Sequence, residues 1–241
     1  MNFYGKIFLL LLFLHGAYIA SAQDNVSDLA SGSGNYHANF QIWTGVKINK
    51  DFKYGISLSG SYLLRTDVSN RMVGGHYFYA SLKYKALKYI HFDFKFRGVN
   101  SFQNNSYRFE IGVKPRYKYK KWTFALRTAY FNDREYFAST YERGRYPVNY
   151  WRNRLEVSWE FKKNWNAYVS AEVYTLFDYL GARVRRVALI GGVDYTFKKM
   201  HNIDVYYMAQ PDFNKKNLRV VQALALVYTW DVPKKFKKKK K

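Results

Sequence analysis

The chain has 241 residues, 20% of them aromatic, and its 40 lysines and arginines against 17 acidic residues give a formal charge of +23. So many aromatic side chains exclude a disordered chain, and the absence of cysteine excludes a disulfide scaffold and a cysteine-ligated metal site. The mean hydropathy of −0.43, with no apolar run near the roughly 18 residues of a spanning helix after the first segment, excludes a helical membrane protein. We expect no metal and no cofactor.

Residues 1–22 have the pattern of a secretory signal peptide. Lys6 precedes the apolar run Ile7–Leu14, and Ala20-Ser21-Ala22 offers the small residues that a signal peptidase requires. We therefore expect cleavage before Gln23, and residues 23–35 form an N-terminal segment that could add a weak strand. An exported chain rarely meets nucleic acid, so we expect no nucleic-acid partner despite the positive charge.

The mature chain alternates apolar and polar residues with a period of two, which is typical of strands. Between Ile90 and Arg97, for example, Phe92, Phe94 and Phe96 share one face, and His91, Asp93, Lys95 and Arg97 share the other. The pattern predicts strands at residues 36–48, 51–65, 73–86, 88–100, 106–119, 121–132, 148–161, 165–177, 183–197, 201–211 and 217–231. Most exceed the about 9–11 residues that a tilted transmembrane strand needs.

The connections between these strands alternate in length. Tight basic turns are expected near residues 49–51, 86–88, 120–121, 162–164 and 198–201, and looser polar stretches near 66–71, 100–106, 132–147, 178–181 and 211–216. In outer-membrane barrels the short turns face the periplasm and the long loops face outward. We therefore predict an all-β fold, an antiparallel up-and-down transmembrane β-barrel of about 10–12 strands over residues 36–232.

The number of predicted strands conflicts with a rule of the class. Single-chain bacterial barrels have an even number of strands, whereas the pattern gives eleven. We favour twelve strands over ten, with residues 24–35 supplying the additional one.

Alternation alone leaves the inside and the outside of the barrel interchangeable. A soluble periplasmic lipid-binding barrel would line a cavity with Phe92, Phe94 and Phe96, whereas a membrane barrel turns them towards lipid. We favour the membrane, because the strands are long and their ends are rich in Tyr and Trp, as in aromatic girdles. The last strand, with Leu224, Leu226, Tyr228 and Trp230, is similar to a signal for the barrel-assembly machinery.

The chain resembles a family of Gram-negative outer-membrane barrels, the domain of unknown function 2490, from about Phe40 to Trp230. The resemblance rests on the segments Tyr150–Glu156, Ala167–Tyr174, Gly192–His201 and Val46–Tyr54. It implies a β-barrel in the outer membrane and supplies no established activity.

One set of charged residues shares the polar faces of neighbouring strands and forms the candidate lumenal charge cluster. Its members are Arg108, Glu110, Arg127, Arg152, Arg154, Glu156, Glu172, Arg186 and Asp194. Such groups can pair across a narrow barrel as a structural plug, which we favour, or form a selectivity ring or ligand site. The arginines outnumber the acids, so any solute that passes is expected to be small and anionic.

Two further features have weaker functional interpretations. His91, with Asp93 two residues further on, is the best candidate for the catalytic residue of an outer-membrane lipid-modifying enzyme. No nucleophile is placed beside it, so we expect no enzymatic activity. The lysine-rich tail, residues 233–241, should hang in the periplasm, where it could touch peptidoglycan or an acidic partner. We expect it to be a solvated run of charge.

Overall fold

The computed structural model describes residues 37–68, 72–101, 105–136, 148–178, 181–213 and 219–233. The predicted signal peptide, the segment 23–35 and the lysines from residue 234 onward lie outside these ranges. No helix within them is long and apolar enough to span a membrane.

Eleven strands and one short 3-10 turn make up the described residues. They are β1 (His37–Asp51), η1 (Lys53–Gly55), β2 (Ile56–Asp67), β3 (Met72–Leu87), β4 (Ile90–Asn100), β5 (Asn105–Tyr119), β6 (Trp122–Tyr136), β7 (Val148–Lys162), β8 (Trp165–Asp178), β9 (Gly181–Phe197), β10 (His201–Asp212) and β11 (Arg219–Val232). Each corresponds to one strand predicted from the alternation, which confirms the all-β fold.

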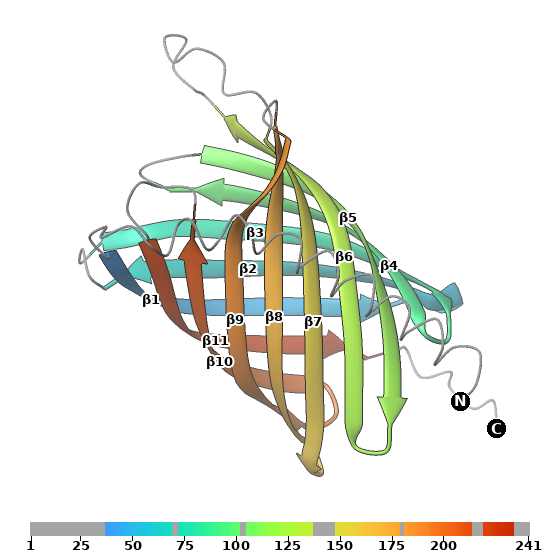
Figure 1. Cartoon of the computed structure of the whole chain (residues 1–241). Coiled ribbons are helices and arrows are strands. Elements are labelled where there is room, and N and C mark those ends of the chain that lie inside the picture. Colours follow the sequence, from blue (N-terminus) through green and yellow to red (C-terminus); the bar gives the residue numbers. More distant parts are fainter. Residues whose placement is uncertain are drawn as a thin grey trace, which may run out of the picture.

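The strands form a closed barrel in which consecutive strands are antiparallel and β1 pairs with β11 in parallel. This seam runs from the pair His37 and Arg219 to the pair Lys50 and Val232. Figure 1 shows the arrows of β1 and β11 side by side and pointing the same way. Our preference for twelve strands was wrong, because both seam strands run from the loop end to the turn end and pair directly with each other.

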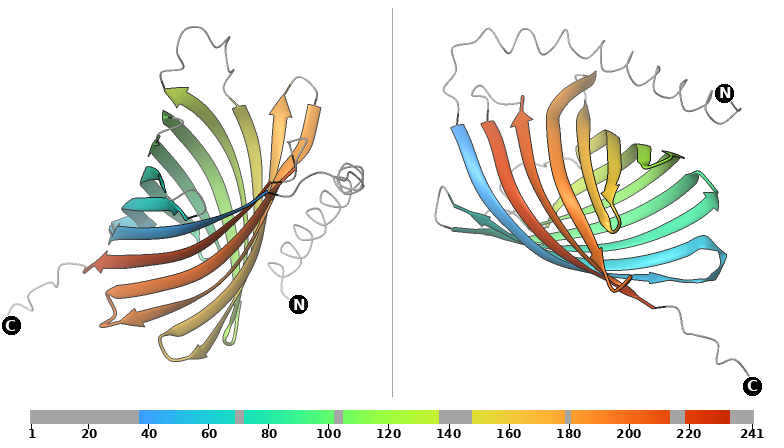
Figure 2. Two further views of the ribbon diagram at one scale, coloured as in Figure 1. Left: turned by 90° about the vertical axis from the view of Figure 1, so that its left-hand side faces the viewer. Right: turned by 90° about the horizontal axis from the view of Figure 1, so that it is seen from below.

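The barrel is strongly twisted rather than a regular cylinder. In Figure 1, β5 to β8 run vertically in front, and β1 to β3 cross behind them. The two views in Figure 2 show the strands continuing around the molecule as one curved sheet. Residues far apart in sequence, on β1 and on β10, therefore line the same interior.

The apolar residues of the alternating pattern lie on the outer face. On β4 and β5, Phe94 is 46% and Ile111 49% exposed, whereas the intervening Asp93 and Glu110 are 4% and 7% exposed. A water-soluble protein rarely exposes a continuous apolar surface of this kind, and a transmembrane barrel requires one. The arrangement therefore favours the membrane barrel over the soluble alternative, in which Phe94 would face a cavity.

A ribbon of aromatic rings follows the turn end of the barrel. Trp122 of β6 stacks on Trp159 of β7, with ring centroids 5.6 Å apart. Contacts between neighbouring rings continue through Phe161, Trp165, Tyr195, Phe197, His201 and Tyr228. Amphipathic rings in this position are typical of the membrane interface, as the sequence predicts.

The first turn lies four residues later than expected. β1 continues to Asp51, and the chain reverses at Tyr54 and Gly55, whose φ angles are 59° and 75°. Glycine adopts this left-handed backbone easily, so Gly55 was the signal in the sequence for the later turn. Tight turns at Lys120, Asn164 and Lys198 also have positive φ and lie where they were predicted.

One half of the barrel interior is packed with apolar side chains. Trp43, Leu63, Ala188, Met208, Ala223 and Ala225 form a buried cluster from β1, β2, β9, β10 and β11. Beside it Gly192 admits the Tyr168 ring, because a Cβ there would lie 2.7 Å from the Tyr168 hydroxyl. The ion pairs that join β4 to β8 occupy the other half.

Candidate functional site

Glu110 of β5 is the centre of the lumenal charge cluster. Arg127 of β6 binds it directly and also holds Asp93 of β4 at 2.5 Å. Arg152 of β7 lies 2.9 Å from Glu110, and the Lys95 ammonium lies 3.7 Å from it. The side chains of Glu110, Asp93 and Arg127 are buried. Since a buried charge is costly without a partner, these contacts hold the neighbouring strands β4 to β7 together around Glu110.

A second group of contacts extends the cluster to β8. Arg154 lies 2.9 Å from Glu156 on its own strand and 3.3 Å from Glu172 on β8. Lys114 of β5 also reaches Glu156 at 3.3 Å. The Tyr174 hydroxyl donates a 2.6 Å hydrogen bond to Glu172. Each carboxylate therefore has at least two partners.

Towards the loop end, Asp133 of β6 joins two arginines. Arg97 of β4 lies 3.1 Å from it, and Arg108 of β5 binds it directly. The Arg108 guanidinium also lies 3.8 Å above the centre of the Phe131 ring, a favourable cation–π contact. Phe131 in turn stacks on Tyr150. The loop end of this half is thus filled by paired charges and aromatic rings.

The two remaining predicted members differ in their placement. Arg186 of β9 pairs with Asp212 of β10 at 3.1 Å and lies 5.8 Å from the Tyr174 ring, which Arg152 also approaches at 5.8 Å. Arg186 therefore adjoins the cluster through Tyr174. Asp194 does not join it. It accepts hydrogen bonds from Asn166 and Asn202 instead.

Several partners in the cluster were missed from the sequence. Asp93 and Lys95 stood on a predicted polar face, but only the strand register brings them to Arg127 and Glu110. Asp133 and Asp212 lay in expected loops. The structure extends β6 to Tyr136 and β10 to Asp212, because paired arginines compensate these inward-facing carboxylates. Residues 132–135 are all polar, so the hydropathy pattern gave no signal that β6 continues there.

His91 lies on the inner face of β4, two residues from Asp93, but the two side chains form no hydrogen bond. Asp93 is engaged by Arg127 and Lys95. Across the neighbouring strands, His91 faces Lys85 and Lys114. A general base needs an orienting partner and a nearby nucleophile, and the described residues bring neither to this imidazole. They also contain no group of three or more His, Asp or Glu side chains placed to hold a metal.

The cluster contains more buried donors than acceptors. Its carboxylates are paired, yet Nη1 of Arg127 and the Nε atoms of Arg108, Arg152, Arg154 and Arg186 are buried without a hydrogen-bond partner. Buried N–H groups of this kind favour an acceptor or an anion. The cluster therefore keeps hydrogen-bond donors without an acceptor after its ion pairs are formed.

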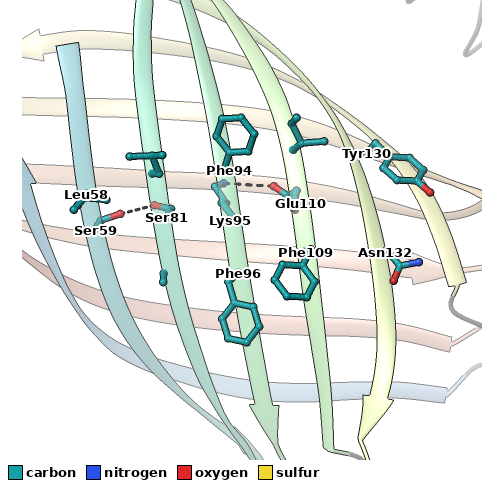
Figure 3. Close-up of a pocket in the computed structure, with 13 residues that line it drawn as sticks. Leu58, Ser59, Ser81, Phe94, Lys95, Phe96, Phe109, Glu110, Tyr130 and Asn132 are labelled. Atoms are coloured by element: carbon teal, nitrogen blue, oxygen red, sulfur yellow. Dashed lines mark hydrogen bonds and ion pairs between the residues drawn. The ribbon is translucent and has the colours of Figure 1, made fainter. Parts of the chain in front are cut away.

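The outer face beside the cluster is a shallow apolar groove over β2 to β6. Phe94, Phe96 and Phe109 line it, and its volume is about 650 Å³. Figure 3 shows these rings around the Lys95–Glu110 pair, which joins the same strands. The lipid-facing surface and the charge cluster are thus two faces of one sheet, and a change on either face acts on the same strands.

Three solved structures have a similar arrangement of strands, and the titles of two of them name outer-membrane proteins. One titled "Bacterial polysaccharide outer membrane secretin" has 10% identity and a TM-score of 0.46, with 72% of this chain and 73% of that chain covered. "Outer-membrane expressed OmpT of Vibrio cholerae" has 8% identity and a TM-score of 0.38, covering 66% of this chain and 57% of that one. The Pseudomonas aeruginosa OccK8 (OprE) has 7% identity and a TM-score of 0.37, with 70% and 57% covered.

No curated protein matches the chain in sequence. A family model described as "Protein of unknown function (DUF2490)" matches residues 40–221. That range runs from β1 into β11 and includes every member of the charge cluster. The chain folds as a closed, mostly antiparallel transmembrane-type β-barrel and belongs to this family of unknown function, DUF2490.

Proposed function

We propose that the protein is a small, mostly occluded barrel of the Gram-negative outer membrane that supports envelope integrity and passes only small anionic solutes. The proposal rests on the arginines of the charge cluster, which have buried N–H groups without a hydrogen-bond acceptor. Their carboxylate partners are all engaged, while N–H groups of Arg127, Arg152 and Arg154 still lack an acceptor. Paired charges fill the space, and the spare donors favour anions over cations.

The proposal includes export by the signal peptide, surrounding outer-membrane lipid and assembly through β11. Outward-facing Leu224, Leu226 and Trp230 on that strand support recognition by the assembly machinery. It assigns no catalytic role to His91, because Asp93 is already paired with Arg127. The lysines of residues 234–241 serve as a solvated periplasmic segment.

Planar-bilayer conductance tests the proposed passage of anions. The mature chain is refolded in detergent, and folding is checked by the gel shift between unboiled and boiled samples. We expect small, discrete currents with an anion-leaning reversal potential in a salt gradient. Arg152→Gln together with Arg154→Gln should move that potential towards cations, since two positive charges beside Glu110 and Glu172 are removed.

Lys118→Gln is the matched control, because Lys118 also pairs with a glutamate but is 61% exposed near the turn end. Its reversal potential should equal that of the wild type. A folded, heat-shifting barrel without current would contradict passage and leave the cluster as a plug. An unchanged reversal potential in the double variant would contradict the role of the arginines.

A further inference from the structure

A second lumenal site adjoins the charge cluster at Lys95 and lies on the side formed by β1 to β4, β10 and β11. It is a cavity of about 280 Å³ lined by four basic side chains, Lys47, Arg65, Lys83 and Lys95. No Asp or Glu is among its lining residues. Cations that line one partly open cavity repel each other, and an anion bound between them would relieve that repulsion.

Three of the four cations, Lys47, Arg65 and Lys83, have no ion-pair partner among the described residues, and Lys95 has two. Lys83 faces Asp93 in the strand register, but Arg127 and Lys95 already hold that carboxylate. Lys47 makes no ion pair either. Asp204 and Asp231, the acids that act on it electrostatically, accept hydrogen bonds from Tyr168 and Asn49 instead.

Arg65 is held in a fixed orientation at the wall of the cavity. Its guanidinium lies between the rings of Trp43 and Tyr77, 3.8 Å from each ring centre. Its Nε is buried without a hydrogen-bond partner. A guanidinium stacked on both faces presents its N–H edge sideways, and that edge matches the paired oxygens of an oxyanion.

Hydroxyl groups complete the lining. Ser59 and Ser81 share a 2.5 Å hydrogen bond, which uses only one of their two protons. Ser61, Tyr79 and Tyr206 add further hydroxyls to the wall. Ammonium, guanidinium and hydroxyl donors on several sides of one space suit an anion that carries more than one charge and accepts from several directions.

We propose that this cavity binds a free tetrahedral oxyanion of the phosphate or sulfate class. The volume is at the lower end for ligand pockets, which limits the guest to a small ion and a few waters. A lipid headgroup is disfavoured, because the basic lining faces the lumen and the opposite face of the same strands carries the apolar exterior. The inference goes beyond the proposed function, because binding in the cavity requires no passage through the barrel.

Isothermal titration of the refolded mature chain with inorganic phosphate, at constant ionic strength in detergent, tests the proposal. We expect saturable binding at one site. Binding should be at least tenfold weaker in the variant that combines Lys47→Gln and Lys83→Gln. Lys163→Gln, which removes an exposed lysine in the β7–β8 turn, should bind as the wild type does.

Each variant is first shown to be folded by the heat-dependent gel shift. Neither Lys47 nor Lys83 has an ion pair to lose, so the double variant should fold. The absence of saturable phosphate binding to the folded wild type would overturn the proposal. Equal phosphate binding by all variants would also overturn it, because the phosphate would then bind outside the cavity, at the basic turns. Phosphate binding by a barrel that carries no current would refute only the proposed passage.

Discussion

Glu110 shows how one buried carboxylate ties several strands together. It contacts Arg127, Arg152 and Lys95, which come from three different strands. We predict that Glu110→Gln lowers the free energy of unfolding by about 3–5 kcal/mol, because the buried Arg127 and the half-buried Arg152 lose a charged partner. Urea unfolding of the barrel in lipid vesicles, followed by tryptophan fluorescence, measures this loss.

Glu160→Gln is the control for this residue-scale prediction. Glu160 is 48% exposed and lies 3.6 Å from Lys118, so it is the same residue type in an open ion pair. Exposed pairs of this kind contribute at most about 1 kcal/mol. Equal losses in both variants would mean that the buried network does not stabilise the barrel.

At the scale of a strand, alternation divides each element into a lipid face and a lumenal face. Ile111 is 49% exposed on the outer face of β5, directly opposite Phe94. Ile111→Arg should destabilise the barrel in vesicles by about 2–4 kcal/mol, since a charge near the middle of the bilayer is costly. Vesicle unfolding curves test this value, with Tyr54→Arg as the control at an 87% exposed turn residue. Near-equal stability of the two variants would contradict the lipid-facing assignment.

The elements were predictable from the sequence because a period of two survives in nearly every strand. The prediction failed where polar residues inside a strand were interpreted as a loop, as at Asp133. Arg108, which is distant in sequence, compensates the Asp133 charge inside the barrel, so the strand continues there. Strand register is a property of pairs of segments, so the contact between Asp93 and Arg127 could not be derived from either segment alone. The candidate cluster was therefore predicted as a set of residues but not as a set of contacts.

At the scale of the whole molecule, the closing pair determines which residues share the interior. The parallel seam brings Trp43 of β1 beside Ala225 of β11, and together with β2 it builds the apolar half of the lumen. No pattern within one strand specifies its partner across the seam. For this reason the alternation alone left the number of strands between ten and twelve.

Closure through β1 and β11 is most directly tested by a disulfide across the seam. Thr44 and Leu226 are partners in the register, and the chain has no cysteine of its own. We predict that Thr44→Cys combined with Leu226→Cys forms a disulfide in the folded barrel. Thr44→Cys with Leu224→Cys should not, because two residues displace the partner by about 6.6 Å along the strand.

A strand inserted at the seam would hold β1 and β11 about 9.6 Å apart, beyond the roughly 7 Å over which Cα atoms can be bridged. Mass spectrometry of the oxidised, heat-shifting protein gives the answer. A disulfide in the matched pair alone supports the eleven-strand barrel with its shared lumen. Its absence from the matched pair would contradict the parallel seam and the arrangement of both lumenal sites.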